Sequence, residues 1–432
     1  MTAAQRVVLI LLLLSLIAGV ATGGRIYYRL SYLWALLLIS GWLWSLLSLR
    51  GLILKRSART LRAQVGQVFE ERFEVQNDSR LPHLWIEIRD ESTLPGSKGS
   101  RVLTLIAGRQ GRSYLARTRL IQRGVFPLGP TELRSGDLFG LFPVKQSLAV
   151  QDSLLVYPMM VELSNFPNPQ GLLPGGEALR RRTQQVTPNA AGVREYAPGD
   201  PLNRIHWLST ARRDRLIVKE FELDPLADVW IILDAAKNVQ TSLSQSFIDI
   251  DPRDFWRRTV KISLPPSTEE YGVSIAASLS RYFLRRGRAV GLVCSGQYLT
   301  LLPPDRGGRQ LGKILEALSL LKAEGRLPLR GLVETQARHL PRGSTVVLIT
   351  PSFYEEIAII CDYLLRRGLR PIAVLLDASS FGGLRGTDRL VENLKTLGIP
   401  VSRVANGDDL EVALSAGVMS LTKHYPIADY VE

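Results

Sequence analysis

Cysteine and histidine are scarce in this chain of 432 residues, and each shortage excludes a class of protein. The two cysteines, Cys294 and Cys361, lie in apolar runs that indicate buried strand or helix. They offer no disulfide framework of the kind that small secreted domains need, in agreement with a reducing compartment. The four histidines show no metal-ligand spacing with one another or with either cysteine, so no common type of zinc site is expected.

Common catalytic and cofactor motifs are missing as well. No Gly-x-Gly-x-x-Gly follows the first apolar strand of the C-terminal half, and no Gly-Lys-Ser/Thr phosphate loop occurs. No Gly-x-Ser-x-Gly elbow supports a serine hydrolase. We therefore expect no cofactor and no catalytic activity.

The charge is one-sided, with 54 Lys and Arg against 40 Asp and Glu and a net charge of +14. Such a chain suits an anionic partner, either nucleic acid or membrane headgroups. A nucleic-acid-binding protein would show a basic face interleaved with aromatic residues or a known binding module, and neither is present. We therefore expect a lipid bilayer as a partner and no nucleic acid.

Two long apolar runs near the N-terminus support the membrane interpretation. Residues 5–24 and 30–49 are each long enough to cross a bilayer as a helix. The first run also resembles a signal peptide, with Arg6 before an apolar core and small residues at its end. Because the second run follows after fewer than ten residues, a helical hairpin accounts for both.

Basic residues around these runs predict the orientation. Arg6 precedes the pair, whereas the connecting turn carries only Arg25 and Arg29. A larger cluster follows the second run: Arg50, Lys55, Arg56, Arg59 and Arg62. Since basic loops stay in the cytoplasm, we expect a two-pass protein of the inner or plasma membrane, with both termini and the soluble domains cytoplasmic.

The soluble part changes its hydrophobic period along the chain. Residues 60–162 alternate with period two between turn residues, which predicts an antiparallel, immunoglobulin-like β-sandwich. Within it, residues 122–142 predict a hairpin and an ordered loop packed on the sandwich, with a ligand loop as the alternative. Residues 163–192 are rich in Pro and Gly and indicate a linker.

The C-terminal half, residues 223–420, alternates apolar strands with amphipathic helices. This order predicts a doubly wound α/β domain with a mostly parallel sheet. Ligands of such folds bind at the carboxyl ends of the strands, where Asp234, Thr350 and Asp377 fall.

Between these domains lies a dense segment, residues 193–222, "VREYAPGDPLNRIHWLSTARRDRLIVKEFE". Asp200 and Pro201 have the positions of an N-cap and of the first helical residue. We expect Trp207 to pack between the soluble domains, and three arginines to share nearby carboxylates in an ion-pair network: Arg194, Arg204 and Arg212. The end of the segment alternates like an edge strand that enters the sheet of the α/β half. The alternative is a docking surface for a partner.

This segment resembles the signature of the bacterial family called domain of unknown function 58, and the resemblance extends over nearly the whole chain. The matching positions are Arg194, Tyr196, Pro198, Gly199, Asp200, Arg204, Ile205, Trp207, Ala211, Arg212 and Lys219. The resemblance implies a C-terminal domain similar to a von Willebrand factor type A domain. It also implies a MoxR-type AAA+ ATPase as partner, and often a transglutaminase-like membrane protein alongside.

Type A domains often hold Mg²⁺ with oxygens of an Asp-x-Ser-x-Ser turn, a Thr and a later Asp, which suit a hard cation. Here the turn reads Asp234-Ala235-Ala236-Lys237-Asn238, and Pro351 follows Thr350 where the later Asp is expected. We therefore expect this degenerate site to be empty. A further departure is an insertion of about thirty residues between Asn238 and Thr268, long enough to be either functional or disordered.

The resulting hypothesis is a non-enzymatic, membrane-anchored adaptor or assembly factor that works with a MoxR-type ATPase in the maturation of protein complexes. The alternative is a ligand-binding or hydrolytic α/β domain that uses Asp234 at the strand ends.

Overall fold

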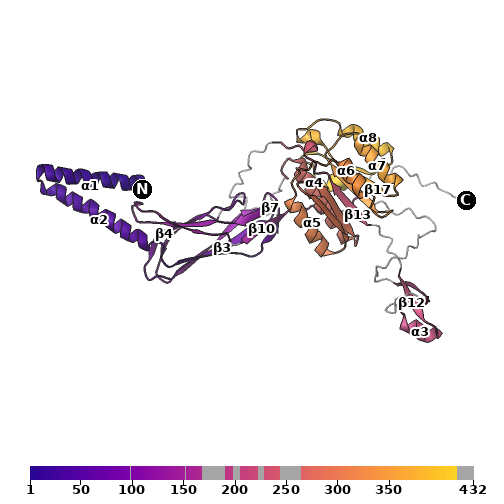
Figure 1. The fold of residues 1–432 in the computed structure, drawn as a ribbon, viewed down its shortest axis with the longest axis horizontal. Coiled ribbons are helices and arrows are strands. Elements are labelled where there is room, and N and C mark those ends of the chain that lie inside the picture. The colour runs from indigo at the N-terminus through magenta and orange to yellow at the C-terminus, as the bar shows by residue number, and fades with distance from the viewer. Residues whose placement is uncertain are drawn as a thin grey trace. The chain divides into compact units, whose positions relative to one another are not determined.

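The structure is a computed structural model of the chain, and the residues that it describes are 1–97, 99–150, 152–167, 190–197, 205–221, 228–243 and 264–415. The chain divides into two compact units, and Figure 1 labels their elements. The first unit consists of Met1–Met160, Ser244–Pro265 and Leu315–Leu321, and the second of Val161–Leu243, Pro266–Ile314 and Lys322–Glu432.

Two long apolar helices begin the first unit. They are α1 (Ala3–Thr22) and α2 (Arg25–Leu47). α1 starts where the Thr2 hydroxyl accepts a hydrogen bond from the amide of Gln5 (3.1 Å). It ends where Gly23 takes a left-handed φ of +62°, a conformation that costs glycine little. Both helices begin a few residues earlier than the runs predict.

The two helices lie side by side as an antiparallel hairpin (Figure 1). Small residues form the contact, where the Oγ atoms of Ser15 and Ser31 lie 3.0 Å apart and are buried. Most large apolar side chains of both helices are exposed instead. Both helices are long and apolar enough to cross a membrane, and the predicted helical pair is confirmed.

Short strands follow and form sandwich-like sheets, as the alternating pattern predicts. One sheet has the order β1 (Leu52–Ala58), β3 (Val68–Asn77), β6 (Gly111–Arg119). Another has the order β5 (Arg101–Ile106), β4 (His83–Asp90), β8 (Thr131–Ser135), β9 (Val144–Leu148). The third has the order β2 (Arg62–Gln64), β10 (Asp152–Tyr157), β7 (Gly124–Leu128).

The core of this unit comes from the inward positions of the alternating strands. Along β3 every second residue is buried, which places Phe73 and Val75 in one cluster with Ile86 of β4 and Leu133 of β8. Sheets that each bury one face against the other give this pattern.

One buried ion-pair cluster crosses the edge of this core. The guanidinium of Arg56 lies 2.7 Å from Glu71 and 2.9 Å from Asp90, and both carboxylates are almost fully buried. Burial raises the pKa of Glu71, although the hydrogen bond from Arg56 acts in the opposite direction. Arginine suits this position because it can bind both carboxylates at once.

The second unit contains a six-stranded sheet, mixed and mostly parallel. Its order is β15 (Leu299–Asp305), β14 (Val290–Ser295), β13 (Val229–Leu233), β16 (Thr345–Thr350), β17 (Arg370–Leu376), β18 (Val401–Val404). All neighbours are parallel except β14 and β15. The helices of this half are α4 (Thr268–Arg285), α5 (Gly308–Leu320), α6 (Leu329–Gln336), α7 (Glu356–Arg366) and α8 (Thr387–Thr396).

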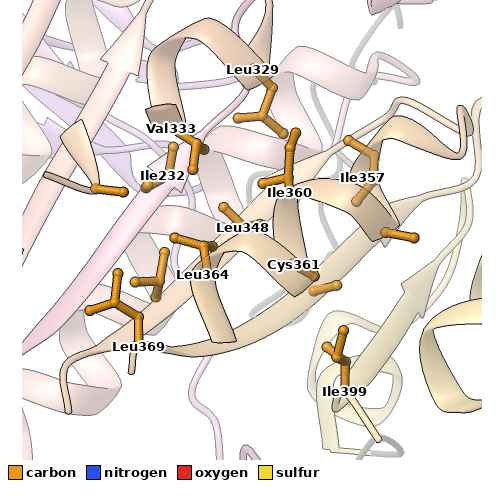
Figure 2. Packing of buried hydrophobic residues seen from close by; sticks show 14 of the residues in the cluster. Ile232, Leu329, Val333, Leu348, Ile357, Ile360, Cys361, Leu364, Leu369 and Ile399 are labelled. Carbon is orange, nitrogen blue, oxygen red and sulfur yellow. The ribbon is translucent and has the colours of Figure 1, made fainter. Parts of the chain in front are cut away.

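The core of the α/β sheet lies between the strands and the helices α6, α7 and α8. In Figure 2, Ile232 of β13 and Leu348 of β16 face Val333 of α6 and Leu364 of α7. The central strands are buried on both faces, as parallel strands are when helices cover both sides of a sheet. The predicted α/β fold is confirmed as a mixed, mostly parallel sheet packed against helices.

Two parts of the chain differ from the sequence expectation. The first residues of the expected linker pack on α4, where the amide of Phe166 donates a hydrogen bond to the Tyr282 hydroxyl (3.1 Å). The signature forms a separate two-stranded sheet from β11 (Ala190–Glu195) and β12 (Ile217–Phe221), with α3 (Trp207–Arg213) between them. The end of the signature therefore does not enter the six-stranded sheet.

Candidate functional site

Asp234 follows β13 directly and lies at the carboxyl end of the sheet. Its backbone amide donates to the carbonyl of Ile349 on β16 (2.9 Å), which fixes the residue between two central strands. The Thr350 hydroxyl donates to Asp234 Oδ2 (2.6 Å), and the amide of Ala236 donates to Oδ1 (3.2 Å). The structure thus brings together Asp234 and Thr350, two of the three residues that the sequence suggests for this site.

The polar groups of this site satisfy one another. Asp234 is only 4% exposed and Thr350 is fully buried. Burial raises the pKa of Asp234, although the hydrogen bonds from Thr350 and Ala236 lower it in part. The Thr350 hydroxyl also accepts a hydrogen bond from the amide of Ser352 (3.0 Å), so both of its roles are used.

The third residue of the degenerate site, Asn238, lies apart from the other two. It is exposed on a short 3₁₀ turn, Lys237–Val239, and within the described residues no hydrogen bond joins it to Asp234 or Thr350. Ala236 is buried at the position where such a metal site would have its first serine hydroxyl. In the part of the chain that the structure describes, no group of His, Cys, Asp or Glu could hold a metal ion.

A glycine that the sequence analysis missed covers the turn after β13. Gly325 donates to the carbonyl of Ala235 (3.0 Å) and accepts from the amide of Lys237 (2.9 Å), as an added parallel strand would. A Cβ on Gly325 would lie 1.9 Å from the carbonyl oxygen of Ser295. Only glycine therefore fits across the ends of β13 and β14, and its only signal in the sequence is a lone Gly between polar residues.

The long insertion leaves the sheet through a paired stem at this same edge. The amide of Leu243 donates to the carbonyl of Pro266 (3.0 Å), and that of Thr268 donates to the carbonyl of Thr241 (3.0 Å). The Thr268 hydroxyl also donates to Gln240 Oε1 (2.7 Å). The stem fixes where the insertion begins and ends, whereas residues 244–263 lie outside the described residues.

Asp377, the other acidic residue predicted at the strand ends, has a structural role. Its carboxylate accepts from the Arg403 guanidinium (2.5 Å) and from the Ser379 hydroxyl (2.8 Å). Burial acts to raise the pKa of Asp377, but the hydrogen bonds from Arg403 and Ser379 outweigh it and lower the pKa. Asp377 thereby caps the turn after β17 and pairs with β18, and it does not join Asp234 in one site.

The signature module forms differently from its expected capped helix. Ile205 makes an antiparallel bridge to Val218, so it is extended where a helix starting at Pro201 would include it. α3 instead begins at Trp207, and the ring of His206 accepts from the amide of Ser209 (3.3 Å). The shorter helix results because residues before it pair with β12.

Trp207 lies on the exposed side of the signature module. Its side chain is 67% exposed, and that of the neighbouring Leu208 is 64% exposed. The packing of Trp207 between the soluble domains, which the sequence predicts, stays a prediction. The buried side of the module is filled by Ile205, Ile217 and Val218.

The expected ion-pair network of Arg194, Arg204 and Arg212 stays a prediction. Arg215 pairs with Glu195, whereas Arg212 is exposed at the end of α3. Tyr196 is half-buried beside β11, and its amide donates to the carbonyl of Leu216 (2.9 Å). The other signature residues cannot be placed in a site: Pro198, Gly199, Asp200 and Arg204 lie outside the described residues, as do the side chains of Arg194 and Lys219.

Solved structures similar to parts of this chain are only remotely so. The CARDB domain of a Pyrococcus furiosus protein in complex with di-metal ions is 10% identical, with a TM-score of 0.18, and covers 24% of this chain and 91% of that one. The cupredoxin domain of amoB from Nitrosocaldus yellowstonii is 9% identical, with a TM-score of 0.17, and covers 32% and 97%. Likeness at this level carries no argument about metals or function.

Sequence comparison is more informative. The uncharacterized protein YeaD of Bacillus subtilis (strain 168) is 24% identical over 237 residues, which are 55% of this chain and 52% of that protein. The chain thus spans about half the length of this curated relative. Residues 192–248 match the family described as protein of unknown function DUF58, so the resemblance that the signature suggests is confirmed over this part of the chain.

Proposed function

We propose that this chain is a non-enzymatic, membrane-anchored adaptor or assembly factor that works with a MoxR-type AAA+ ATPase in the maturation of protein complexes. The observation that carries the proposal is the exposed face of α3, with Trp207, Leu208 and Arg212. Trp and Arg are enriched among the residues that dominate binding energy at protein interfaces.

The module around α3 holds this face in a fixed position. A helix of seven residues with no buried side chain is not stable by itself. Three interactions support α3 here. The His206 ring caps its first turn, and Ile205 just before it pairs with Val218 of β12. The amide of Ile217 also donates a hydrogen bond to the Thr210 hydroxyl (3.1 Å). A supported helix that exposes its large apolar residues suits a docking surface better than a core element.

The alternative, a ligand-binding or hydrolytic domain that uses Asp234, has less support. A general acid or base must reach a substrate, and the Asp234 carboxyl is buried, with Thr350 and Ala236 bonded to its two oxygens. Gly325 lies across the adjoining turn. These contacts favour a structural role for Asp234.

The finer architecture belongs to the same proposal. We assign the N-terminal sheets to an immunoglobulin-like sandwich. The strand order of the other sheet, with the antiparallel β15 at its edge, follows the doubly wound order and supports a von Willebrand factor type A-like domain.

The proposed location is the inner or plasma membrane, with α1 and α2 as spans and both termini and the soluble domains cytoplasmic. The basic residues after α2 support this orientation. Besides the ATPase and the bilayer, a transglutaminase-like membrane protein is a proposed partner, and nucleic acid is not.

The test is crosslinking and affinity purification of the full-length protein from native membranes, with ATP or a non-hydrolysable analogue. We expect an AAA+ ATPase to copurify with the wild type. Trp207→Ser and Arg212→Glu should each reduce its recovery at least about ten-fold, the size of an interface hot spot. Lys313→Glu, which makes the same charge change at an exposed position of α5, should leave recovery unchanged. Equal recovery with all variants, or no ATPase with a folded and abundant wild type, would overturn the proposal.

A further inference from the structure

The loop between β8 and β9, residues 136–143, exposes two large apolar side chains at its tip. Leu138 is 69% exposed and Phe139 is 62% exposed, although Asp137 before them and Leu141 after them are buried. Ordinary surface loops contain polar residues at such a tip. An exposed Leu-Phe pair on an ordered loop needs an explanation.

Internal hydrogen bonds hold the backbone of this loop. The Asp137 carboxylate accepts from the amide of Phe139 (3.0 Å) and from the amide of Phe142 (2.6 Å). The amide of Gly140 donates to the Asp137 carbonyl (3.3 Å). A loop whose backbone donors are bonded within the protein can enter an apolar medium at lower cost than one whose donors need water.

The loop packs on both N-terminal helices. A Cβ on Gly41 of α2 would lie 3.3 Å from the Phe142 ring and 3.6 Å from Asp137 Cγ. The Thr2 hydroxyl, at the start of α1, donates to the carbonyl of Leu141 (3.1 Å). The loop is therefore continuous with the apolar helical hairpin.

The register of α1 against α2 shows at which level of the hairpin the loop contacts the helices. Ser15 of α1 faces Ser31 of α2, and the helices run antiparallel from there. Following both helices toward the sandwich places Gly41 level with Arg6, to within about one residue of helix rise. Arg6 is the last charge before the apolar run of α1. Trp42, which is exposed next to Gly41, is the kind of residue found at a membrane interface. A bilayer crossed by the hairpin would therefore have its boundary between hydrocarbon and headgroups at the level of this loop.

Exposed arginines lie at the same end of the sandwich. Arg50, Arg80 and Arg109 are all exposed, and backbone hydrogen bonds join their segments: Asp78 N to Gly51 O (2.8 Å) and Arg109 N to Ser79 O (3.0 Å). A small cavity at this end is lined by Trp44 of α2, by Leu81 and by Ser135, the last residue before the loop. Exposed arginines at this end of the sandwich suit the negative charge of anionic headgroups.

We propose that residues 136–143 form a membrane wedge, in which Leu138 and Phe139 insert into the cytoplasmic leaflet while Arg50, Arg80 and Arg109 bind anionic headgroups. The wedge seats the sandwich directly on the lipid surface. This inference rests on the proposed membrane anchoring through α1 and α2.

The test uses the full chain in vesicles of phosphatidylcholine and phosphatidylglycerol, with a fluorescent maleimide probe at one introduced cysteine. Labelling is selective because burial raises the pKa of both native thiols, Cys294 and Cys361, to about 12. The three positions are Phe139→Cys at the loop tip, Leu36→Cys on the exposed side of α2, and Val68→Cys in β3. Val68 and Asn77 are the two ends of β3, and Asn77 is at the end nearer the helices. Along β3 these ends are about 30 Å apart.

Lipids with a nitroxide quencher near the headgroup or near the chain end report the depth of each probe. We expect the Phe139 probe to be quenched about two-fold more by the shallow nitroxide than by the deep one, as for a side chain inserted at the interface. The Leu36 probe should respond to the deep nitroxide and the Val68 probe to neither. Omitting phosphatidylglycerol should weaken the quenching at Phe139 alone.

The probe at Leu36 separates the two ways in which the proposal can fail. If Leu36 is quenched and Phe139 behaves like Val68, the chain is anchored but the wedge is wrong. If Leu36 itself is not quenched, the anchoring is wrong and the wedge falls with it. The Phe139 side chain is exposed, so replacing it with cysteine leaves the core of the sandwich intact.

Discussion

Asp234 is a residue whose chemistry depends on its burial. Its folded pKa is raised above the unfolded value by burial. The folded state therefore holds the proton more tightly, and this contribution to stability is complete below the unfolded pKa and is lost as pH rises through the folded pKa. A buried carboxyl kept for its hydrogen bonds with Thr350 and Ala236 needs no negative charge.

Asp234→Asn should consequently be tolerated. The amide oxygen can still accept from Ala236, so we expect the free energy of unfolding near neutral pH to be unchanged or about 1 kcal/mol higher. The loss of stability as pH rises above the ordinary pKa of an aspartate should become smaller, because the titrating group is gone. Asp234→Ala, which leaves both donors without an acceptor, should cost about 2 kcal/mol.

Denaturant unfolding of the full chain in detergent, followed over this pH range with and without Mg²⁺, measures these effects. The wild type should gain no stability from Mg²⁺, since a ligand stabilises only a state that binds it. A clear stabilisation by Mg²⁺ that Asp234→Asn abolishes would contradict the structural role and restore the metal site.

At the scale of elements, the segment around Gly325 acts as a cover on the ends of β13 and β14. Gly325→Ala would bring a Cβ to 1.9 Å from the Ser295 carbonyl oxygen and 2.9 Å from that of Ala235. Both neighbours are backbone, which cannot turn away, so we expect a loss of about 3 kcal/mol or more, in the range for strained substitutions.

Gly312→Ala is the matched control for that substitution. Gly312 lies within α5, and nothing is within 4 Å of an added Cβ. Alanine should stabilise the helix by up to about 1 kcal/mol. Thermal unfolding of both variants compares them, and a Gly325→Ala protein as stable as Gly312→Ala would show that the cover moves freely.

Elements with a strong period were predictable from the sequence, and weakly patterned ones were not. The run of β13 and the amphipathic pattern of α4 predict the observed elements because burial imposes those periods. The edge strand β15 was not predicted, since it carries two prolines and is half exposed. The signature was misjudged because pairing of Ile205 with β12 overrides the local helical spacing.

At the scale of the whole molecule, the sequence predicted which residue types the candidate site contains. It did not predict which distant segments contact the site. The sequence shows that the turn after Asp234 lacks the serine hydroxyls of a metal site. It also shows that the N-terminal part of the chain is apolar. Gly325 covers the turn after β13, and the loop of residues 136–143 contacts α2 through Phe142. Both contacts join residues that are far apart in the chain. Such long-range contacts depend on the packed fold and leave no local pattern.

The proposed membrane topology predicts that α1 stays part of the protein. α1 is held by α2 through Ser15 and Ser31 and by the sandwich loop through Thr2. A cleaved signal peptide would leave these partners without α1, so we expect the mature protein to retain residues 1–22, and mass spectrometry of its N-terminal peptides measures this.

The orientation is tested in intact cells with a membrane-impermeant maleimide. Thr22→Cys, at the exposed end of α1, should be labelled from outside, because the turn between the helices carries few basic residues. Val68→Cys in the sandwich should be labelled only after the membrane is opened, and the buried native cysteines should react in neither case. Labelling of Val68→Cys in sealed cells would place the soluble domains outside, where a cytoplasmic AAA+ ATPase could not reach α3. The adaptor proposal therefore depends on this result before any partner is sought.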